Sequence, residues 1–163
     1  MIPLELQDLL KERFERELDP LLLHDPTTGE RTKKVTVCKQ HLPKPKPSTS
    51  RTSRSDDYSQ FPFLVVRINE GDIGGEEHSC RISFIAAVYD DNDDQQGYSD
   101  SMIIAQRVVS SLIRDPVVGN QFRCSGEISY VSDDEDVSPF FYAAVVTNWE
   151  IPKSISEEVE GLI

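Results

Sequence analysis

The residues best suited to chemistry are the carboxylates between Tyr89 and Gly97, in the stretch YDDNDDQQG. Its aspartates and Asn92 offer the hard oxygen ligands that Ca²⁺ and Mg²⁺ prefer. The stretch therefore raises the question of whether the chain carries a metal site or only a polar loop.

An EF-hand calcium loop places oxygen ligands at alternate positions, glycine at the sixth position and glutamate at the twelfth. A loop that starts at Asp90 has Gln95 at the sixth position and Ser101 at the twelfth. Starting one residue later restores neither requirement. The pattern does not predict a specific calcium site and leaves open only a weak, nonspecific divalent site.

A structural role fits the acidic stretch better, because an apolar helical pattern follows it directly. Negative charge near a helix N-terminus is favourable by roughly 0.3–1 kcal/mol for each group. Asp93, Asp94 and Asp100 lie close to the predicted helix start, and Ser99 or Asp100 is suited to capping it. We interpret the loop mainly as the start of that helix.

Other catalytic signatures are missing from the sequence. The three histidines, at 24, 41 and 78, are scattered, and no HExxH, GxSxG or Walker-type phosphate loop occurs. Cys38, Cys80 and Cys124 form no CxxC pair, which is typical of reduced thiols in a cytosolic chain. The sequence predicts a protein that is not an enzyme, with no cofactor and no structural metal.

Composition limits the classes of partner. The chain has 163 residues, a net charge of -12 and a pI of about 4.6. That length suits a single domain over residues 1–163. The excess negative charge argues against a nucleic-acid-binding surface, and no apolar run approaches the ~20 residues that span a membrane.

The N-terminal third combines a helix, a strand and a basic arm. Leu6, Leu10, Phe14 and Leu18 recur every fourth residue and predict an amphipathic helix. Residues 33–42 alternate like a strand. Residues 43–62 are rich in Pro, Ser, Lys and Arg and nearly free of aliphatic side chains, so we expect a flexible arm there.

The rest of the chain predicts strands around one buried helix. Residues 63–68 and 80–89 resemble an antiparallel hairpin, and residues 121–131 and 140–152 supply later strands. The helix is expected over residues 98–114, with Ile104, Val108 and Leu112 buried. The predicted class is α+β: a mostly antiparallel mixed sheet of four to five strands, flanked by an N-terminal helix and a middle helix.

Two stretches together resemble the tail terminator, or tail-to-head joining, proteins of long-tailed phages and prophages. The first is the loop and helix from Tyr89, in which Gly97-Tyr98 opens the helix. The second is the late strand PFFYAAVVTNWEIP, whose Thr147, Trp149 and Pro152 match a Thr-x-Trp-x-x-Pro ending. The resemblance covers roughly residues 63–152, and the basic arm departs from the family pattern.

The resemblance implies a structural virion protein that caps the tail tube, ends its polymerisation and forms the tail side of the head–tail joint. It implies a ring, usually a hexamer, that contacts the tail-tube protein and a head-connector or neck protein. DNA would only pass through the lumen, without sequence-specific binding. The implied location is the virion tail or neck, and the host cytoplasm during assembly.

Candidate interface residues come from the acidic loop, the helix start and the basic arm. They are Asp91, Asp93, Asp94, Tyr98, Lys44, Lys46, Arg51 and Arg54. Three alternatives stay open at this point: another neck, connector or minor tail protein, a small divalent-metal-dependent enzyme that uses the Asp90–Asp94 loop, and an acidic binding module with a basic tether.

Overall fold

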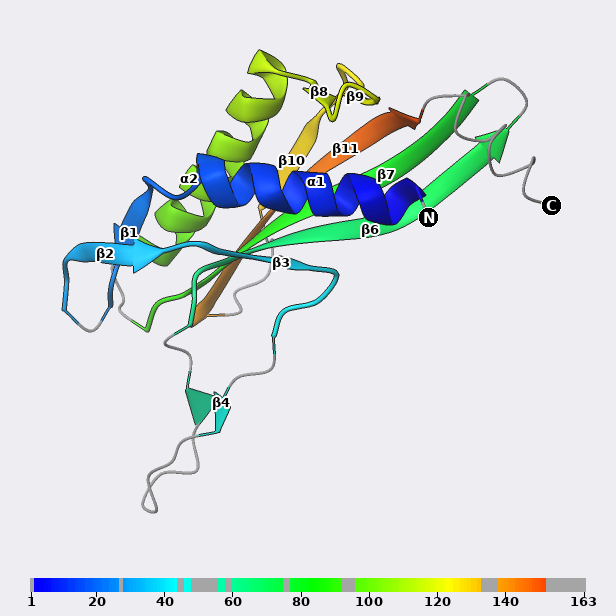
Figure 1. Ribbon diagram of the computed structural model, residues 1–163. Helices are drawn as coiled ribbons and strands as arrows, with labels where there is room; N and C mark the ends of the chain where they lie inside the picture. The colour runs from blue at the N-terminus through cyan, green and yellow to red at the C-terminus, as the bar shows by residue number, and fades with distance from the viewer. Residues whose placement is uncertain are drawn as a thin grey trace.

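A computed structural model shows how the elements are arranged (Figure 1). It describes residues 2–26, 28–43, 46–47, 56–57, 60–74, 77–91, 96–132 and 138–151. Within those ranges the helices are α1 (Ile2–Glu17) and α2 (Gln96–Arg114). The strands are β1 (Leu22–His24), β2 (Arg31–Lys34), β3 (Thr36–Lys39), β4 (Lys46–Pro47), β5 (Asp56–Asp57), β6 (Phe63–Gly74), β7 (Glu77–Tyr89), β8 (Val117–Val118), β9 (Phe122–Cys124), β10 (Ser129–Ser132) and β11 (Phe140–Ile151).

One mixed sheet dominates the fold. In the described residues it has seven strands in the order β3-β6-β7-β11-β9-β8, and β10 also pairs with β11. Every pairing is antiparallel except β3 with β6, which is parallel. The α+β class and the two flanking helices are confirmed. The extra strands arise because the strand predicted over residues 121–131 divides into β9 and β10, and because Val117–Val118 adds β8.

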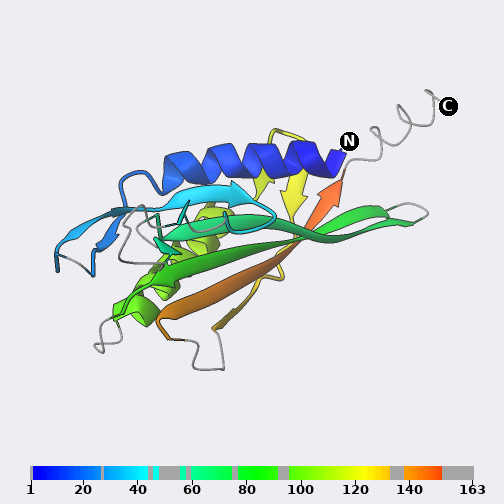
Figure 2. The ribbon, with the colours of Figure 1, turned by 90° about the horizontal axis from the view of Figure 1, so that it is seen from below.

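The β6–β7 hairpin is longer than the sequence predicted. We expected strands over 63–68 and 80–89, joined by a Gly-rich turn, but the ladder continues to the pair Gly74↔Glu77. A register shift between Ile68 and Glu70 bends the ladder where the strands leave the core. Beyond this bulge the residues of β6 are exposed, and the hairpin projects from the body of the molecule (Figures 1 and 2).

Both helices cover the same face of the sheet. Their apolar stripes and the alternate residues of β6, β7 and β11 form one buried cluster, in which Phe14 packs edge-on against Phe84 at 5.2 Å. The predicted core positions Ile104, Val108 and Leu112 are all buried, which confirms the placement of the middle helix. Figure 2 shows α1 lying along this side of the sheet.

Buried polar side chains join α1 to its neighbours. Arg13 Nη2 donates to the Ser111 carbonyl at 2.6 Å and to Ser111 Oγ at 2.9 Å, so the guanidinium links the two helices. Burial lowers the pKa of Arg13, although Asp115 and Glu17 nearby act in the opposite direction. Gln7 Nε2 donates to Gln40 Oε1 at 2.7 Å and to the Val66 carbonyl at 2.8 Å.

Two small ribbons were not predicted. Strands β1 and β2 pair antiparallel, and only Lys33 and Lys34 of this ribbon fall within the strand predicted over residues 33–42. Strands β4 and β5, of two residues each, pair within the basic segment 43–62. Most of that segment lies outside the described residues, so the expected flexibility of the arm stays a prediction.

Candidate assembly surface

The start of α2 is shaped by a close contact with β11. A Cβ placed on Gly97 would lie 2.6 Å from Phe141 Cε2 and closer still to Cδ2. It would also lie 3.0 Å from the Cβ of the buried Asp90. Glycine is therefore needed at this position because the helix backbone approaches an aromatic ring, which gives the Gly-Tyr motif a structural reason.

Asp100 is not the helix cap that the sequence indicated. Because α2 begins at Gln96, Asp100 stands inside the helix, where it is buried. Its Oδ1 accepts from Gln96 Nε2 at 2.9 Å, and its Oδ2 accepts from the backbone N–H of His24 at 3.3 Å. Burial raises the pKa of Asp100, and these two hydrogen bonds partly oppose the rise. The side chain ties β1 to α2.

Ser99, the other suggested cap, also lies inside α2 and is exposed. The prediction that Ser99 or Asp100 caps the helix is wrong, because the helix begins earlier than its apolar pattern does. The polar residues before Met102 already have helical backbone geometry. Apolar periodicity could not predict that they belong to the helix, because they are not apolar.

The Thr-x-Trp motif on β11 is an internal hydrogen-bond relay. Trp149 Nε1 donates to Thr147 Oγ1 at 2.8 Å, and Thr147 Oγ1 donates to the Ile82 carbonyl on β7 at 2.8 Å. Both side chains are fully buried. The motif therefore holds the sheet interior and presents no surface to a partner.

The predicted interface residues fall into two groups. Asp91 is exposed after β7, and Tyr98 is 48% exposed in the first turn of α2, so both are accessible near the same helix end. Lys46 is described only as part of the backbone of β4. The others lie outside the described residues: Asp93, Asp94, Lys44, Arg51 and Arg54.

No metal or thiol chemistry is indicated within the described part of the chain. No three His, Cys, Asp or Glu side chains converge there as metal ligands. The acidic loop at residues 92–95 lies outside that part, so the weak divalent site stays an untested hypothesis.

Burial raises the pKa of all three thiols, and that of Cys124 to about 11, which disfavours the reactive thiolate at neutral pH.

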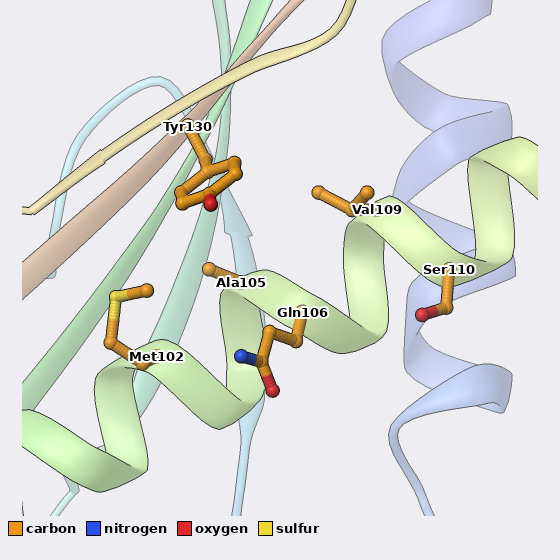
Figure 3. A pocket seen from close by; sticks show the side chains of 6 residues that line it. All are labelled: Met102, Ala105, Gln106, Val109, Ser110 and Tyr130. Atoms are coloured by element: carbon orange, nitrogen blue, oxygen red, sulfur yellow. The ribbon is translucent and has the colours of Figure 1, made fainter.

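A pocket beside α2 was not predicted from the sequence. Its volume is about 250 Å³, and Figure 3 shows its lining: Met102, Ala105, Gln106, Val109, Ser110 and Tyr130. A second hollow of about 600 Å³ involves the next turn of α2, at Leu112 and Ile113, together with Ile128. The helix spacing of Met102, Val109 and Ile113 could have indicated this apolar flank, but Tyr130 joins it only through the fold.

Strand β10 borders the first hollow and forms an edge of the sheet. Its side chains are all exposed, including Tyr130 at 63% and Val131 at 56%. In the described residues β10 pairs only with β11, so its other side has no strand partner. Strand β3 forms the opposite edge and, among the strands that the structure describes, pairs only with β6. Open edges with apolar side chains favour strand addition.

No protein-family model matches the chain, and no curated protein is detectably similar to it in sequence. Within the described residues, neither helix combines the length and apolar character needed to cross a lipid bilayer.

Proposed function

We propose that this protein is a structural subunit of a long-tailed phage or prophage particle. In this role it caps the tail tube, stops tube polymerisation and forms the tail side of the head–tail joint. It acts as a closed homo-oligomeric ring, most simply a hexamer, between the tail-tube protein and a connector protein.

One observation carries the proposal. The two stretches that resemble tail terminators pack together: Gly97 of the Gly-Tyr motif lies against Phe141 of the strand that also holds Thr147 and Trp149. The rest of α2 packs on β7 and β11. Residues from separate parts of the sequence thus make one structural unit, which supports treating their joint resemblance as meaningful.

The charge of the chain supports the same role. A net charge of -12 gives a ring a negative field, and a negative lumen would let packaged DNA pass without adhering.

The experiment mixes the protein with the tail-tube subunit encoded beside it and images the products by electron microscopy. We expect shorter tubes with the protein bound at one end. Tubes that keep lengthening, with no protein at their ends, would reject the proposed role. A tail-tube subunit from an unrelated phage serves as the control, since its tubes should grow to the same length with or without the protein.

A further inference from the structure

A buried carboxyl group joins the β1–β2 ribbon to α2. Asp100 is 1% exposed, and its Oδ2 accepts from the backbone N–H of His24 at 3.3 Å. The ribbon forms a two-stranded sheet of its own, separate from the main sheet. Figure 1 shows β1 beside the N-terminal end of α2, where this hydrogen bond lies. A titratable group therefore lies directly between the ribbon and the helix.

The ribbon has an anchored base and an outer part. Leu21 and Leu23 belong to the buried core and hold the base in place. A register shift between Leu23 and His24 interrupts the ladder immediately after the anchored residues. Shifts of this kind bend a strand and disrupt its pairing locally. The outer ribbon, which we define as residues 24–26 and 28–31, lies beyond the shift and meets Asp100 at His24.

The hydrogen bonds that Asp100 accepts come from neutral donors. Gln96 Nε2 donates to Oδ1 at 2.9 Å, and the second donor is the His24 N–H. The charged groups that act on Asp100 are His24 on β1 and Arg31 on β2, and within the described part of the chain neither forms an ion pair with it. A carboxylate that is buried without an ion pair is more costly than the neutral acid. Docking of the ribbon should therefore favour the protonated form.

We propose that the outer ribbon is a proton-controlled strap, docked on α2 while Asp100 is protonated and released from α2 as Asp100 ionises. Release lets water reach the carboxylate and removes the cost of its burial. The base of the ribbon stays in the core, and the register shift between Leu23 and His24 is the hinge. This inference does not rest on the proposed tail function.

Proton linkage gives the sign of the effect. Burial raises the pKa of Asp100 above its ordinary value of 3.8, and the hydrogen bonds from Gln96 and His24 and the charges of His24 and Arg31 partly oppose the rise. The docked state therefore binds the proton more tightly than the released state, in which the carboxyl group is hydrated. Docking is strongest below pH 3.8 and weakens as the pH rises through the pKa of the docked state.

Release changes the charge at the start of α2. Asp100 gains a negative charge, and Arg31, an exposed cation that acts on Asp100 in the docked state, moves away with the outer ribbon. Both changes make this end of the helix more negative. A partner that binds there therefore meets a different surface below and above the transition.

A pH titration of the whole chain by NMR tests the strap. The Cγ chemical shift of Asp100 reports its ionisation, and the protection of the His24 amide against hydrogen exchange, relative to its intrinsic rate, reports docking. We expect both to change with one midpoint above pH 3.8. Each pH unit between the midpoint and 3.8 corresponds to about a tenfold loss of protection. The Leu23 amide, in the anchored base, should keep its protection.

Two variants separate the proton from the packing. Asp100→Asn keeps a side-chain acceptor and cannot ionise, so protection of the His24 amide should not change with pH. Arg31→Gln removes a cation that favours the carboxylate, so the midpoint should move to higher pH. A merely structural contact would not shift the midpoint. Asp91→Asn alters an exposed carboxylate after β7 and should leave the titration unchanged.

Three results would overturn the strap: a midpoint at or below pH 3.8, a His24 amide whose protection does not follow the Asp100 carboxyl group, or a loss of protection that persists in Asp100→Asn. If Asp100→Asn does not fold, the titration of Arg31→Gln decides alone, and an unchanged or lowered midpoint rejects the proposal. Failure of the tube-capping experiment would affect none of these results, because none of them requires a partner.

Discussion

Strands β11 and β10 are neighbours in one sheet, yet their side chains differ in burial. Along β11 every second residue is buried, from Ala143 to Trp149, whereas all four side chains of β10 are exposed. Residue type does not explain the difference, because Val131 is as apolar as its neighbours on β11. The difference follows from position: β11 has strand partners on both sides and helix α2 packed on it, while β10 has a strand partner on one side only among the described residues. An interior strand stabilises the fold, and an edge strand is available to a second molecule.

The largest effect should come from removing the buried indole ring near the C-terminal end of β11. Trp149→Ala deletes a fully buried side chain and should cost about 3–5 kcal/mol of unfolding free energy. Tyr130→Ala, the matched aromatic truncation on β10, should cost far less because that ring is mostly exposed. Urea unfolding of both variants checks the contrast, and equal losses would remove the distinction between the strands.

The close approach of α2 to β11 predicts a smaller penalty. Gly97→Ala forces a methyl group into the Phe141 ring and should destabilise by about 1–3 kcal/mol, the usual cost of overpacking. Gly126→Ala is the control, since a Cβ there meets no atom within 4 Å. Adding Phe141→Leu to Gly97→Ala should restore part of the thermal stability. A neutral Gly97→Ala would contradict the contact.

The hydrogen-bond relay on β11 can be broken without changing volume. Thr147→Val leaves Trp149 Nε1 and the Ile82 carbonyl buried without their partner, which should cost about 1–3 kcal/mol. Thr147→Ser keeps the hydroxyl and should lose only the methyl contribution. Equal stability of the valine and serine variants in urea unfolding would mean that the relay does not matter.

The tie between β1 and α2 should appear as a pH dependence. The folded-state pKa of Asp100 is raised above its ordinary value of 3.8, mainly by burial. Its contribution to stability is therefore fully present below that ordinary value and is lost as pH rises through the folded pKa. Asp100→Asn cannot titrate, so its stability relative to wild type should improve as pH rises from about 3.8. Parallel pH profiles of unfolding free energy would contradict this sign.

The smallest effect on folding is expected at the edge. Val131→Arg changes an exposed side chain and should alter unfolding free energy by no more than ~0.5 kcal/mol. Thermal melts of dilute, monomeric protein should be nearly superimposable with wild type. A large loss would mean that Val131 belongs to the core of a single subunit rather than to its edge.

The sequence predicted the elements that show their own periodicity. The stripe from Leu6 to Leu18 and the spacing of Ile104, Val108 and Leu112 identified both helices, because each pattern lies within one segment. The β6–β7 hairpin was found for the same reason, although its length was not. Exposed residues such as Asp72 and Ile73 do not follow an alternation of buried and exposed positions, so the part of the strand pair beyond the bulge could not be predicted from the sequence.

The missed features depend on contacts between distant segments. The parallel pairing of β3 with β6 joins Thr36 to Phe63 across the basic arm, and no local pattern encodes it. Asp100 was predicted to cap the helix. Its hydrogen bond from the backbone N–H of His24 could not be predicted, because the two residues are far apart in the sequence. The hollow beside α2 needed Tyr130 from another element. Candidate site residues in the acidic loop and arm were chosen by composition, and most lie outside the described structure.

The unequal sequence separation of the strand pairs has a consequence for folding order. Strands β6 and β7 lie close together in the sequence, since β6 ends at Gly74 and β7 begins at Glu77, whereas β3 reaches β6 across more than twenty intervening residues. Closing the longer loop loses more chain entropy before any contact compensates. We expect the hairpin to form early and the segment of α1 and β3 to dock late, held by Gln7, Gln40 and Arg13. In native-state hydrogen exchange, the amides of β3 should open at lower free energy than those of β7, so the β3 edge would be the first part of the sheet to unfold.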